Sequence, residues 1–328
     1  MRTKDIELAN ISRFRGELMG AAMLFIILFH VGLPRTDLFF GLRRCGNIGV
    51  DIFLFLSGVG LWFSWVKQPS IWSFYRRRLL RILPAWLIMA SLYYIPRFNP
   101  QTGSIIDLIG NITINWNFWL HDELTFWYIP AIMMLYLWAP PYMKLITKHP
   151  IYRWSVVLMV LWCVMVQWII PVHHAVGHLE IFWSRVPIFF LGINFGEMVR
   201  REVRIDGAAV WLALITFVAC FASCIYLEQV SHGRFPLFVE RMIYIPLTLT
   251  AILLLNRIFR RLPQRVNRFW AFFGGLSLEA YLIHNHFVMA WLSPYHLSYW
   301  PTSLLTIVLT IPLAWLLHQF VKRLLQWL

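Results

Sequence analysis

The most constraining feature of this sequence is a series of long apolar runs separated by clusters of charged residues. A transmembrane helix needs about 20 mostly apolar residues to cross roughly 30 Å of hydrocarbon. Ten runs approach that length, namely 18–34, 48–66, 80–96, 126–145, 152–171, 184–199, 208–227, 238–256, 271–292 and 301–321. They predict an all-α, polytopic membrane protein of about ten transmembrane helices, in which residues 1–328 form a single integral-membrane domain.

The composition excludes an ordinary soluble globular protein. Hydrophobic residues make up 59% of the 328 positions and charged residues only 13%, about half the charge of a typical soluble domain. Such a chain lacks the polar side chains needed to cover its surface in water. No Walker loop, dinucleotide fingerprint, HExxH or GxSxG motif occurs, so soluble nucleotide-dependent or hydrolase chemistry has no motif support.

The distribution of Lys and Arg predicts the orientation in the membrane. Of these 29 residues, 22 fall on the side of the N-terminus, including Arg2 and Lys4. The positive-inside rule therefore places both termini in the cytoplasm, with 1–17 as a cytoplasmic segment and 97–125 as the longest outer loop. The run from Ser104 to Leu120 in that loop has the composition of an interfacial amphipathic helix. The net charge of +14 is then explained by collars facing anionic lipid rather than by nucleic acid.

Two ionisable residues are expected at the same depth near the outer boundary. His30 ends the first span and Asp51 begins the second, which runs back inward. A carboxylate beside an imidazole fixes its tautomer and raises its basicity, so the two form a candidate catalytic pair. The alternative is that both are interfacial residues bracketing a short loop.

The ninth span carries a second group of polar residues. Ser277, Glu279, Tyr281, His284 and His286 fall within ten residues of one another. Because this span runs outward, His284 should approach the level of the first-span histidine, and two histidines at one depth can share a site. Ionisable residues inside spans usually mark functional sites, although hydrogen-bonded packing between helices also explains them.

A basic cluster at the cytoplasmic end of the third span is denser than topology requires. Arg78 and Arg81 are three residues apart and share a helix face, next to Arg77, and guanidinium groups bind phosphate bidentately. A phosphorylated cofactor entering from the cytoplasm could dock there, or the cluster only enforces orientation. The outer HHxxxH run at His173 to His178 lacks a carboxylate at ligand spacing, and no metal site is predicted.

Three segments together resemble the integral-membrane acyltransferase 3 family, which includes sugar O-acetyltransferases of bacterial surface polysaccharides. They are 15–20 (RGELMG) leading to His30, 49–58 (GVDIFLFLSG) and 77–84 (RRLLRILP). Weaker similarities lie at 126–130 and 277–284. The resemblance covers nearly the whole chain, and ten spans with both ends inside also suit the family.

The resemblance implies an acyl-CoA-dependent O-acyltransferase of the bacterial plasma membrane. Its donor substrate would be acetyl-CoA or another acyl-CoA, and its acceptor a hydroxyl of a cell-surface or lipid-linked carbohydrate. The residues that would serve this reaction are His30 as general base or transient acyl carrier, Asp51 as its orienting partner, His284 as a further catalytic residue, Arg77, Arg78 and Arg81 on the CoA phosphates, and Ser57 lining the channel.

One position departs from the family pattern. The family commonly has an Arg eleven residues before the histidine, where this chain has Met19, and Arg15 stands one turn earlier. Either Arg15 or another cation takes its place, or the chain belongs to a branch that handles the acyl group differently. The competing hypotheses are a transporter or flippase of a lipid-linked saccharide and a noncatalytic membrane subunit.

Overall fold

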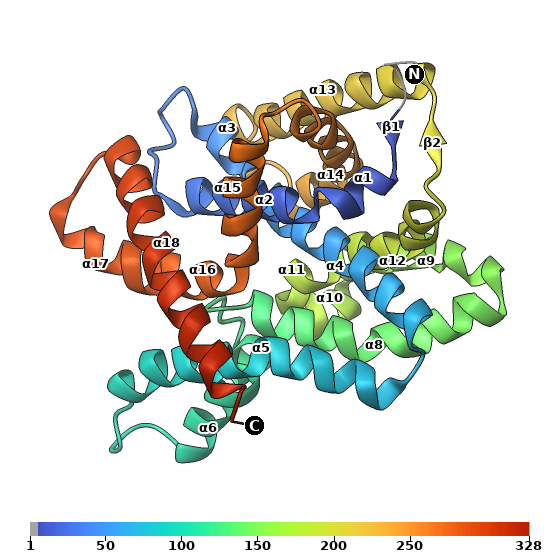
Figure 1. The fold of residues 1–328 in the computed structure, drawn as a ribbon. Helices are drawn as coiled ribbons and strands as arrows, with labels where there is room; N and C mark the ends of the chain where they lie inside the picture. The colour runs from blue at the N-terminus through green and yellow to red at the C-terminus, as the bar shows by residue number, and fades with distance from the viewer. Residues whose placement is uncertain (1–5, 328) are drawn as a thin grey trace.

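The computed structural model describes residues 6–327 and is built almost entirely of helices (Figure 1). Arg2 and Lys4 of the predicted cytoplasmic collar lie outside these residues. The α-helices are α1 Ala9–Arg13, α2 Arg15–His30, α3 Phe40–Cys45, α4 Ile48–Lys67, α5 Ile71–Tyr94, α6 Ile105–Ile114, α7 Trp116–His121, α8 Tyr128–Lys148, α9 Ser155–Trp168, α10 Ile170–Val176, α11 Glu180–Trp183, α12 Val186–Arg200, α13 Gly207–Gln229, α14 Leu237–Phe259, α15 Gln264–Gly275, α16 Ser277–Ile283, α17 Ala290–Leu292 and α18 Tyr299–Leu324. Two-residue strands, β1 Ile6–Glu7 and β2 Arg204–Ile205, pair antiparallel.

Within residues 6–327, seven helical segments are long and apolar enough to cross a membrane, and an eighth results if a bent pair counts as one span. That pair joins Ile170–Trp183 to Val186–Arg200 at an angle of 45°. Two of the ten predicted spans take another form. The first is α2, of 16 residues, and the ninth is divided between the end of α15, α16, a π-helix at His284–Met289 and α17. A polytopic all-α membrane protein is supported, while the count of ten and the cytoplasmic termini stay predictions.

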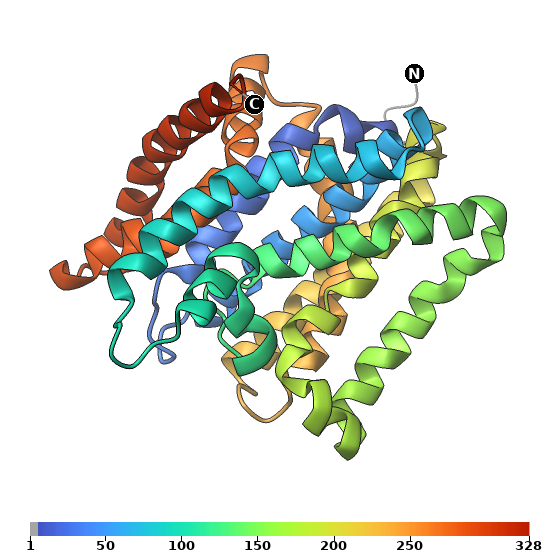
Figure 2. The same ribbon diagram turned by 90° about the horizontal axis from the view of Figure 1, so that it is seen from below.

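The spans differ sharply in how much of their surface other helices cover. In the most apolar part of the segment containing α4, 83% of residues are buried, whereas the figures are 11% for the segment containing α9 and 17% for α13. Figure 2 shows α9, in green, lying along one side of the bundle. Apolar side chains on α9 and α13 therefore remain available to lipid, and α4 forms the centre of the fold.

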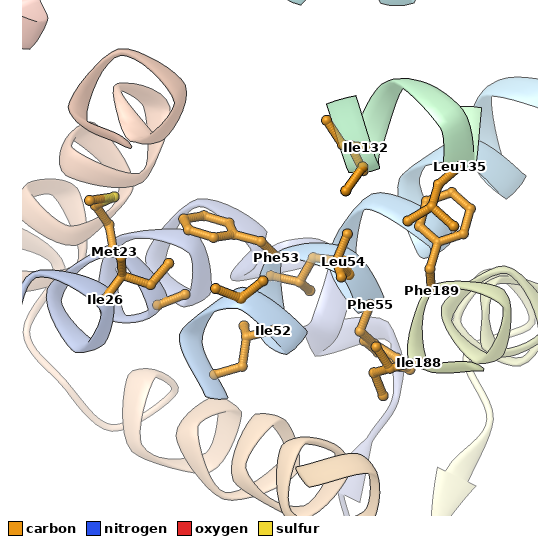
Figure 3. Close-up of a cluster of buried hydrophobic side chains, with 14 of the residues drawn as sticks. Met23, Ile26, Ile52, Phe53, Leu54, Phe55, Ile132, Leu135, Ile188 and Phe189 are labelled. Carbon is orange, nitrogen blue, oxygen red and sulfur yellow. The ribbon is translucent and has the colours of Figure 1, made fainter. Parts of the chain in front are cut away.

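The core around α4 is assembled from four helices (Figure 3). Phe55 of α4 and Phe189 of α12 are fully buried there, as is Leu135 of α8. The other side chains labelled in Figure 3 are Met23, Ile26, Ile52, Phe53, Leu54, Ile132 and Ile188. This packing holds α2 against α4 and thereby fixes the two ends of α2, which carry the candidate site.

Close helix contacts depend on glycine at two crossings. A Cβ added to Gly58 of α4 would lie 2.3 Å from the carbonyl oxygen of Phe189, and one added to Gly192 would lie 2.3 Å from that of Phe55. On the other side of α2, a Cβ on Gly274 of α15 would lie 1.9 Å from the Gly16 carbonyl oxygen. Small residues allow helix backbones to approach in this way in membrane proteins, so α2 is clamped between α4 and α15.

The predicted amphipathic helix of the outer loop is two helices rather than one. Ser104 caps α6 by accepting a hydrogen bond from the backbone N–H of Ile106 at 3.2 Å. Asn115, with φ of 51°, then ends α6 in the left-handed conformation that Asn tolerates better than most residues. The chain turns at that residue into α7, which leads back toward α8.

Candidate active site

Two histidines from distant parts of the chain meet at the end of α2. His30 is the last residue of α2, and His284 begins the π-helix that follows α16. His30 Nδ1 lies 2.9 Å from His284 Nε2. His284 is buried and His30 half-buried. The structure therefore brings together the two histidines that the sequence suggested could share a site, and the π-helix is a feature that often accompanies functional sites.

Hydrogen bonds define the tautomers of this pair in its neutral form. His284 Nδ1 lies 3.0 Å from the carbonyl oxygen of Ala280 and 2.9 Å from that of Tyr281. Carbonyl oxygens only accept, so this nitrogen carries a proton, and Nε2 of the neutral ring can only accept. His30 Nδ1 must then donate to it. The remaining nitrogen, His30 Nε2, keeps its lone pair, which is what a general base or nucleophile requires.

Asp51 does not have the partner that the sequence suggested. Its Oδ2 lies 3.0 Å from Arg185 Nη1, and both side chains are fully buried. The contact is an ion pair without an aligned hydrogen bond, and Arg185 Nη2 also donates to Asn47 Oδ1 at 3.2 Å. Equal depth placed Asp51 beside His30 in the sequence argument, but depth says nothing about which face of a helix a residue occupies. Asp51 is therefore not placed to orient His30, whereas His284 is hydrogen-bonded to it.

A column of hydroxyl groups runs from the histidine pair into the bundle. The backbone N–H of Tyr128, the first residue of α8, donates to the hydroxyl of Tyr281 at 3.3 Å. The Tyr128 hydroxyl lies close enough to Ser57 of α4 to interact with it. These side chains come from three different spans and lie close together inside the bundle. Ser57, which the sequence predicted to line a channel, therefore has polar neighbours.

Three arginines converge at the opposite end of α2. Arg15 is the first residue of that helix, and its guanidinium group packs on Gly60 of α4, where an added Cβ would lie 3.3 Å from Arg15 Nη2. It lies within electrostatic range of Arg78 and Arg81 of α5 and also of Tyr136. Nε of Arg15 and Nε of Arg78 are buried with no hydrogen-bond partner. Arg15 therefore joins the predicted basic cluster.

No carboxylate compensates this arginine cluster, which we define as Arg15, Arg78 and Arg81. Across residues 6–327, none of the three makes an ion pair within 4.0 Å. Arg15 also stands at a helix N-terminus, where the helix dipole disfavours a cation. Arg15 and Arg78 are partly buried and Arg81 is exposed, and gathering such cations without counter-ions costs free energy. An arrangement of this kind suits an anionic ligand that supplies the missing charge.

Arg77 is directed elsewhere. Its Nη1 donates to Gln68 Oε1 and to Ser73 Oγ, each at 2.6 Å, and its Nη2 donates to Ser64 Oγ at 3.3 Å. The side chain is exposed, and these neutral partners occupy it along the first turns of α5. Arg77 thus differs from the arginine cluster in having its guanidinium group bonded to neutral side chains, although it remains within electrostatic range of Arg78.

The two sites lie at opposite ends of one helix. At about 1.5 Å of rise per residue, His30 lies roughly 22 Å along α2 from Arg15. Tyr136, Tyr128, Ser57 and Tyr281 provide polar groups between these ends. The arrangement offers an anion-binding group at one end, a histidine with a bare nitrogen at the other, and hydroxyl groups in between.

Sequence reasoning missed an extensive set of paired charges near the histidine end. Glu228 contacts Arg44 at 3.0 Å and His232 at 2.6 Å. Arg241 pairs with Glu180, and the hydroxyl of Tyr244 donates to Glu240. The sequence placed Arg185 on the outer side, at the start of the predicted run 184–199. Its only sequence signal is its place one residue before the apolar run of α12, which does not reveal a buried partner.

Other polar residues singled out by the sequence lie apart from the histidine pair. Glu279 Oε1 contacts His318 Nδ1 at 2.8 Å, so this carboxylate pairs with α18. His286 packs edge-on against Tyr93 with ring centroids 5.2 Å apart. His173 donates from Nδ1 to the carbonyl oxygen of Val166 at 3.1 Å. No group of three or more His, Cys, Asp or Glu within residues 6–327 is placed to hold a metal ion.

One comparison with known proteins identifies the family of this chain. The family Acyl_transf_3, described as an acyltransferase domain, matches residues 20–319. The chain is also 29% identical over 188 residues to a protein of Caenorhabditis elegans named "Regulator of hypoxia-inducible factor 1", in a match covering 45% of this chain and 36% of that protein. The chain thus spans about a third of this relative's length. No solved structure matches.

Proposed function

Because this chain belongs to the Acyl_transf_3 family of acyltransferase domains, we propose that it moves an acetyl group from cytoplasmic acetyl-CoA to a hydroxyl of a cell-surface or lipid-linked carbohydrate, in the plasma membrane of a bacterium. The observation that carries this proposal is the arginine cluster without counter-ions at one end of α2, together with the histidine pair at the other. The family match favours acyl transfer over the transport hypothesis.

The arginine cluster would hold the phosphate groups of the donor. Guanidinium groups form bidentate, charge-assisted hydrogen bonds with phosphate, and the buried Nε atoms of Arg15 and Arg78 still have hydrogen bonds to make. The neutral pantetheine arm would then run beside α2 past Tyr128 and Ser57. Its thioester would reach the level of His30.

His30 would act as the general base. Its bare Nε2 takes the proton of the acceptor hydroxyl while that oxygen attacks the thioester carbonyl carbon. The new C–O ester bond forms as the C–S bond breaks, and the imidazolium returns the proton to the departing sulfur of CoA. His284 holds the ring in the tautomer that leaves Nε2 free, and it accepts the hydrogen bond from Nδ1 throughout.

The test is acetyl transfer from radiolabelled acetyl-CoA to surface glycan in membranes carrying each variant. His30→Ala should lower the rate about 10²- to 10⁴-fold, the usual contribution of a general acid–base residue. His174→Ala, which removes an exposed histidine of α10, is the matched control and should keep the wild-type rate. Transfer at the wild-type rate in His30→Ala would refute the role of His30.

A further inference from the structure

An apolar groove runs along α2 on the side facing α13 and α14. Its volume is about 940 Å³. Its walls include Phe25 and Leu28 of α2, Phe217 and Phe221 of α13, and Leu255 and Ile258 of α14. In Figure 1, α18 lies on one side of α2, and α13 and α14 lie on the other. The groove therefore follows membrane-spanning helices from the histidine end of the bundle toward the opposite end, as an extended apolar chain would.

The end of the groove near the histidine pair is polar and carries one cation and one carboxylate. Arg43 lines it, and its Nε donates to the carbonyl oxygen of Phe29 at 3.0 Å. Among the described residues, its terminal nitrogens have no hydrogen-bond or ion-pair partner. Tyr299 lines the same end, as does Asp37, whose carboxylate accepts the backbone N–H of Phe39 at 2.8 Å. Arg43 thus offers its two terminal NH₂ groups to an anion at the mouth of an apolar groove.

This mouth lies against the last turn of α2. Arg43 and Tyr299 hydrogen-bond to the carbonyl oxygens of Phe29 and Leu28, the two residues that precede His30. At 100° per residue, the groove-lining side chain of Leu28 and the side chain of His30 project from nearly opposite faces of the helix. A group attached to a phosphate at Arg43 must therefore pass the end of α2, about one helix diameter or roughly 10 Å, to reach His30. A sugar linked through phosphate has that reach.

We infer that this groove binds the apolar chain of a lipid-linked saccharide, with its phosphate on Arg43 and its sugar directed past the end of α2 toward His30. The inference rests on the proposed function and narrows its acceptor to a saccharide carried on a phosphate-linked lipid. An apolar tail with a single anionic group matches the groove in both shape and charge. A free polysaccharide has no apolar chain that would fill this groove.

The experiment measures binding of a fluorescent polyprenyl phosphate to the purified full chain in detergent. Gly32 lines the mouth of the groove, and a Cβ added there meets nothing within 4 Å, so Gly32→Trp should fold normally and fill the mouth. Affinity should fall about tenfold or more, because displacing even a few methylene groups from an apolar site has that effect. Ile215→Trp is the matched control, since Ile215 is exposed and lies on the opposite face of α13 from Phe217. It should bind as the wild type does.

A second variant tests the phosphate contact. Arg43→Gln should weaken binding of polyprenyl phosphate but leave binding of uncharged polyprenol unchanged. Phosphatidylglycerol and inorganic phosphate serve as competitors, and both should compete poorly. Equal binding by Gly32→Trp and the wild type, or equal competition by phosphatidylglycerol, would overturn the inference and make the groove an ordinary lipid crevice.

The outcome is separable from that of the proposed function. Acetyl-CoA binding, measured on the same preparations, depends on the arginine cluster at the other end of α2. If the wild type binds acetyl-CoA and Gly32→Trp still binds polyprenyl phosphate with wild-type affinity, only the proposed lipid site is refuted. If the wild-type protein neither binds acetyl-CoA nor transfers acetyl groups, the proposed function is refuted instead. The polyprenyl phosphate measurement then still shows whether the groove binds this lipid.

Discussion

Asp51 and Arg185 face each other at 3.0 Å near one end of the bundle. At the other end, Arg15, Arg78 and Arg81 have no ion-pair partner among residues 6–327, and the polar contact of Arg81 is to the carbonyl oxygen of Gly275 at 3.3 Å. Arg185 is fully buried and Arg15 and Arg78 are partly buried, while Arg81 is exposed, but only the first group supplies an opposite charge inside the protein. A buried ion pair whose partner is lost leaves an uncompensated charge, so it is part of what holds the fold together. Like charges gathered without a counter-ion instead lower stability until a ligand neutralises them. The difference separates residues that hold the structure from residues that await a substrate.

The largest effect should come from breaking the ion pair. Asp51→Ala leaves Arg185 fully buried and uncompensated, which should cost about 3–5 kcal/mol of unfolding free energy. The measurement is the thermal unfolding midpoint of the purified protein in detergent. The double change Asp51→Leu with Arg185→Met removes both charges and should recover most of the loss. If Asp51 served His30 instead, Asp51→Asn would lower turnover per folded molecule without lowering that midpoint.

Removing cations of the arginine cluster should weaken donor binding without lowering stability, the reverse of what is expected for the ion pair. The double change Arg78→Ala with Arg81→Ala should weaken acetyl-CoA binding about 100-fold, since hydrogen bonds to charged groups contribute roughly 1.5–3 kcal/mol each. Thermal stability without ligand should stay the same or rise, because like-charge repulsion is relieved. Isothermal calorimetry and thermal unfolding on the same sample check both parts. Unchanged affinity for acetyl-CoA would mean that these arginines only set the orientation of the protein in the membrane.

A smaller effect should follow from changing Arg15. Arg15→Met should weaken acetyl-CoA binding about tenfold, because one of three phosphate-binding cations is lost. Met19 lies one turn further along α2 and is partly buried against the core. The double change Arg15→Met with Met19→Arg should therefore restore part of the affinity, as residues four apart share a helix face. A double variant no better than the single one would show that the two positions do not serve the same site.

The smallest effect should come from Arg77. Arg77→Ala should alter acetyl-CoA affinity and unfolding free energy by no more than about 0.5 kcal/mol, because the side chain is exposed and bonded to neutral partners. It is also the matched control for the Arg78 and Arg81 variants, since it removes the same charge from the same helix. A loss as large as theirs would mean that all three α5 arginines bind the donor.

Much of the fold followed from residue order alone. Lipid cannot satisfy backbone polar groups, so long apolar runs must be helical, and their lengths located α4, α8, α13, α14 and α18 well. The third run, 80–96, missed the first nine residues of α5, where the basic cluster interrupts the apolar pattern. The ninth span was less predictable, because an apolar run does not reveal a π-helix that begins at His284. Spacing also placed Arg78 and Arg81 on one face, and depth brought His30 and His284 to one level.

What spacing could not supply was the partner of each charge. Asp51 lies at the depth of His30, but its helix face directs it to Arg185, more than a hundred residues away in the sequence. Arg15 is distant from Arg78 along the chain and comes within electrostatic range of it only through the tertiary packing of the helices.

The sequence by itself determined that this chain is a helical membrane protein with an acyltransferase pattern, because hydrophobic length and motif order are local properties. Only the tertiary structure decided which buried charges are paired and which are not. Pairing depends on the rotation and crossing of helices, which glycine contacts such as Gly58 with Gly192 fix through space rather than along the chain.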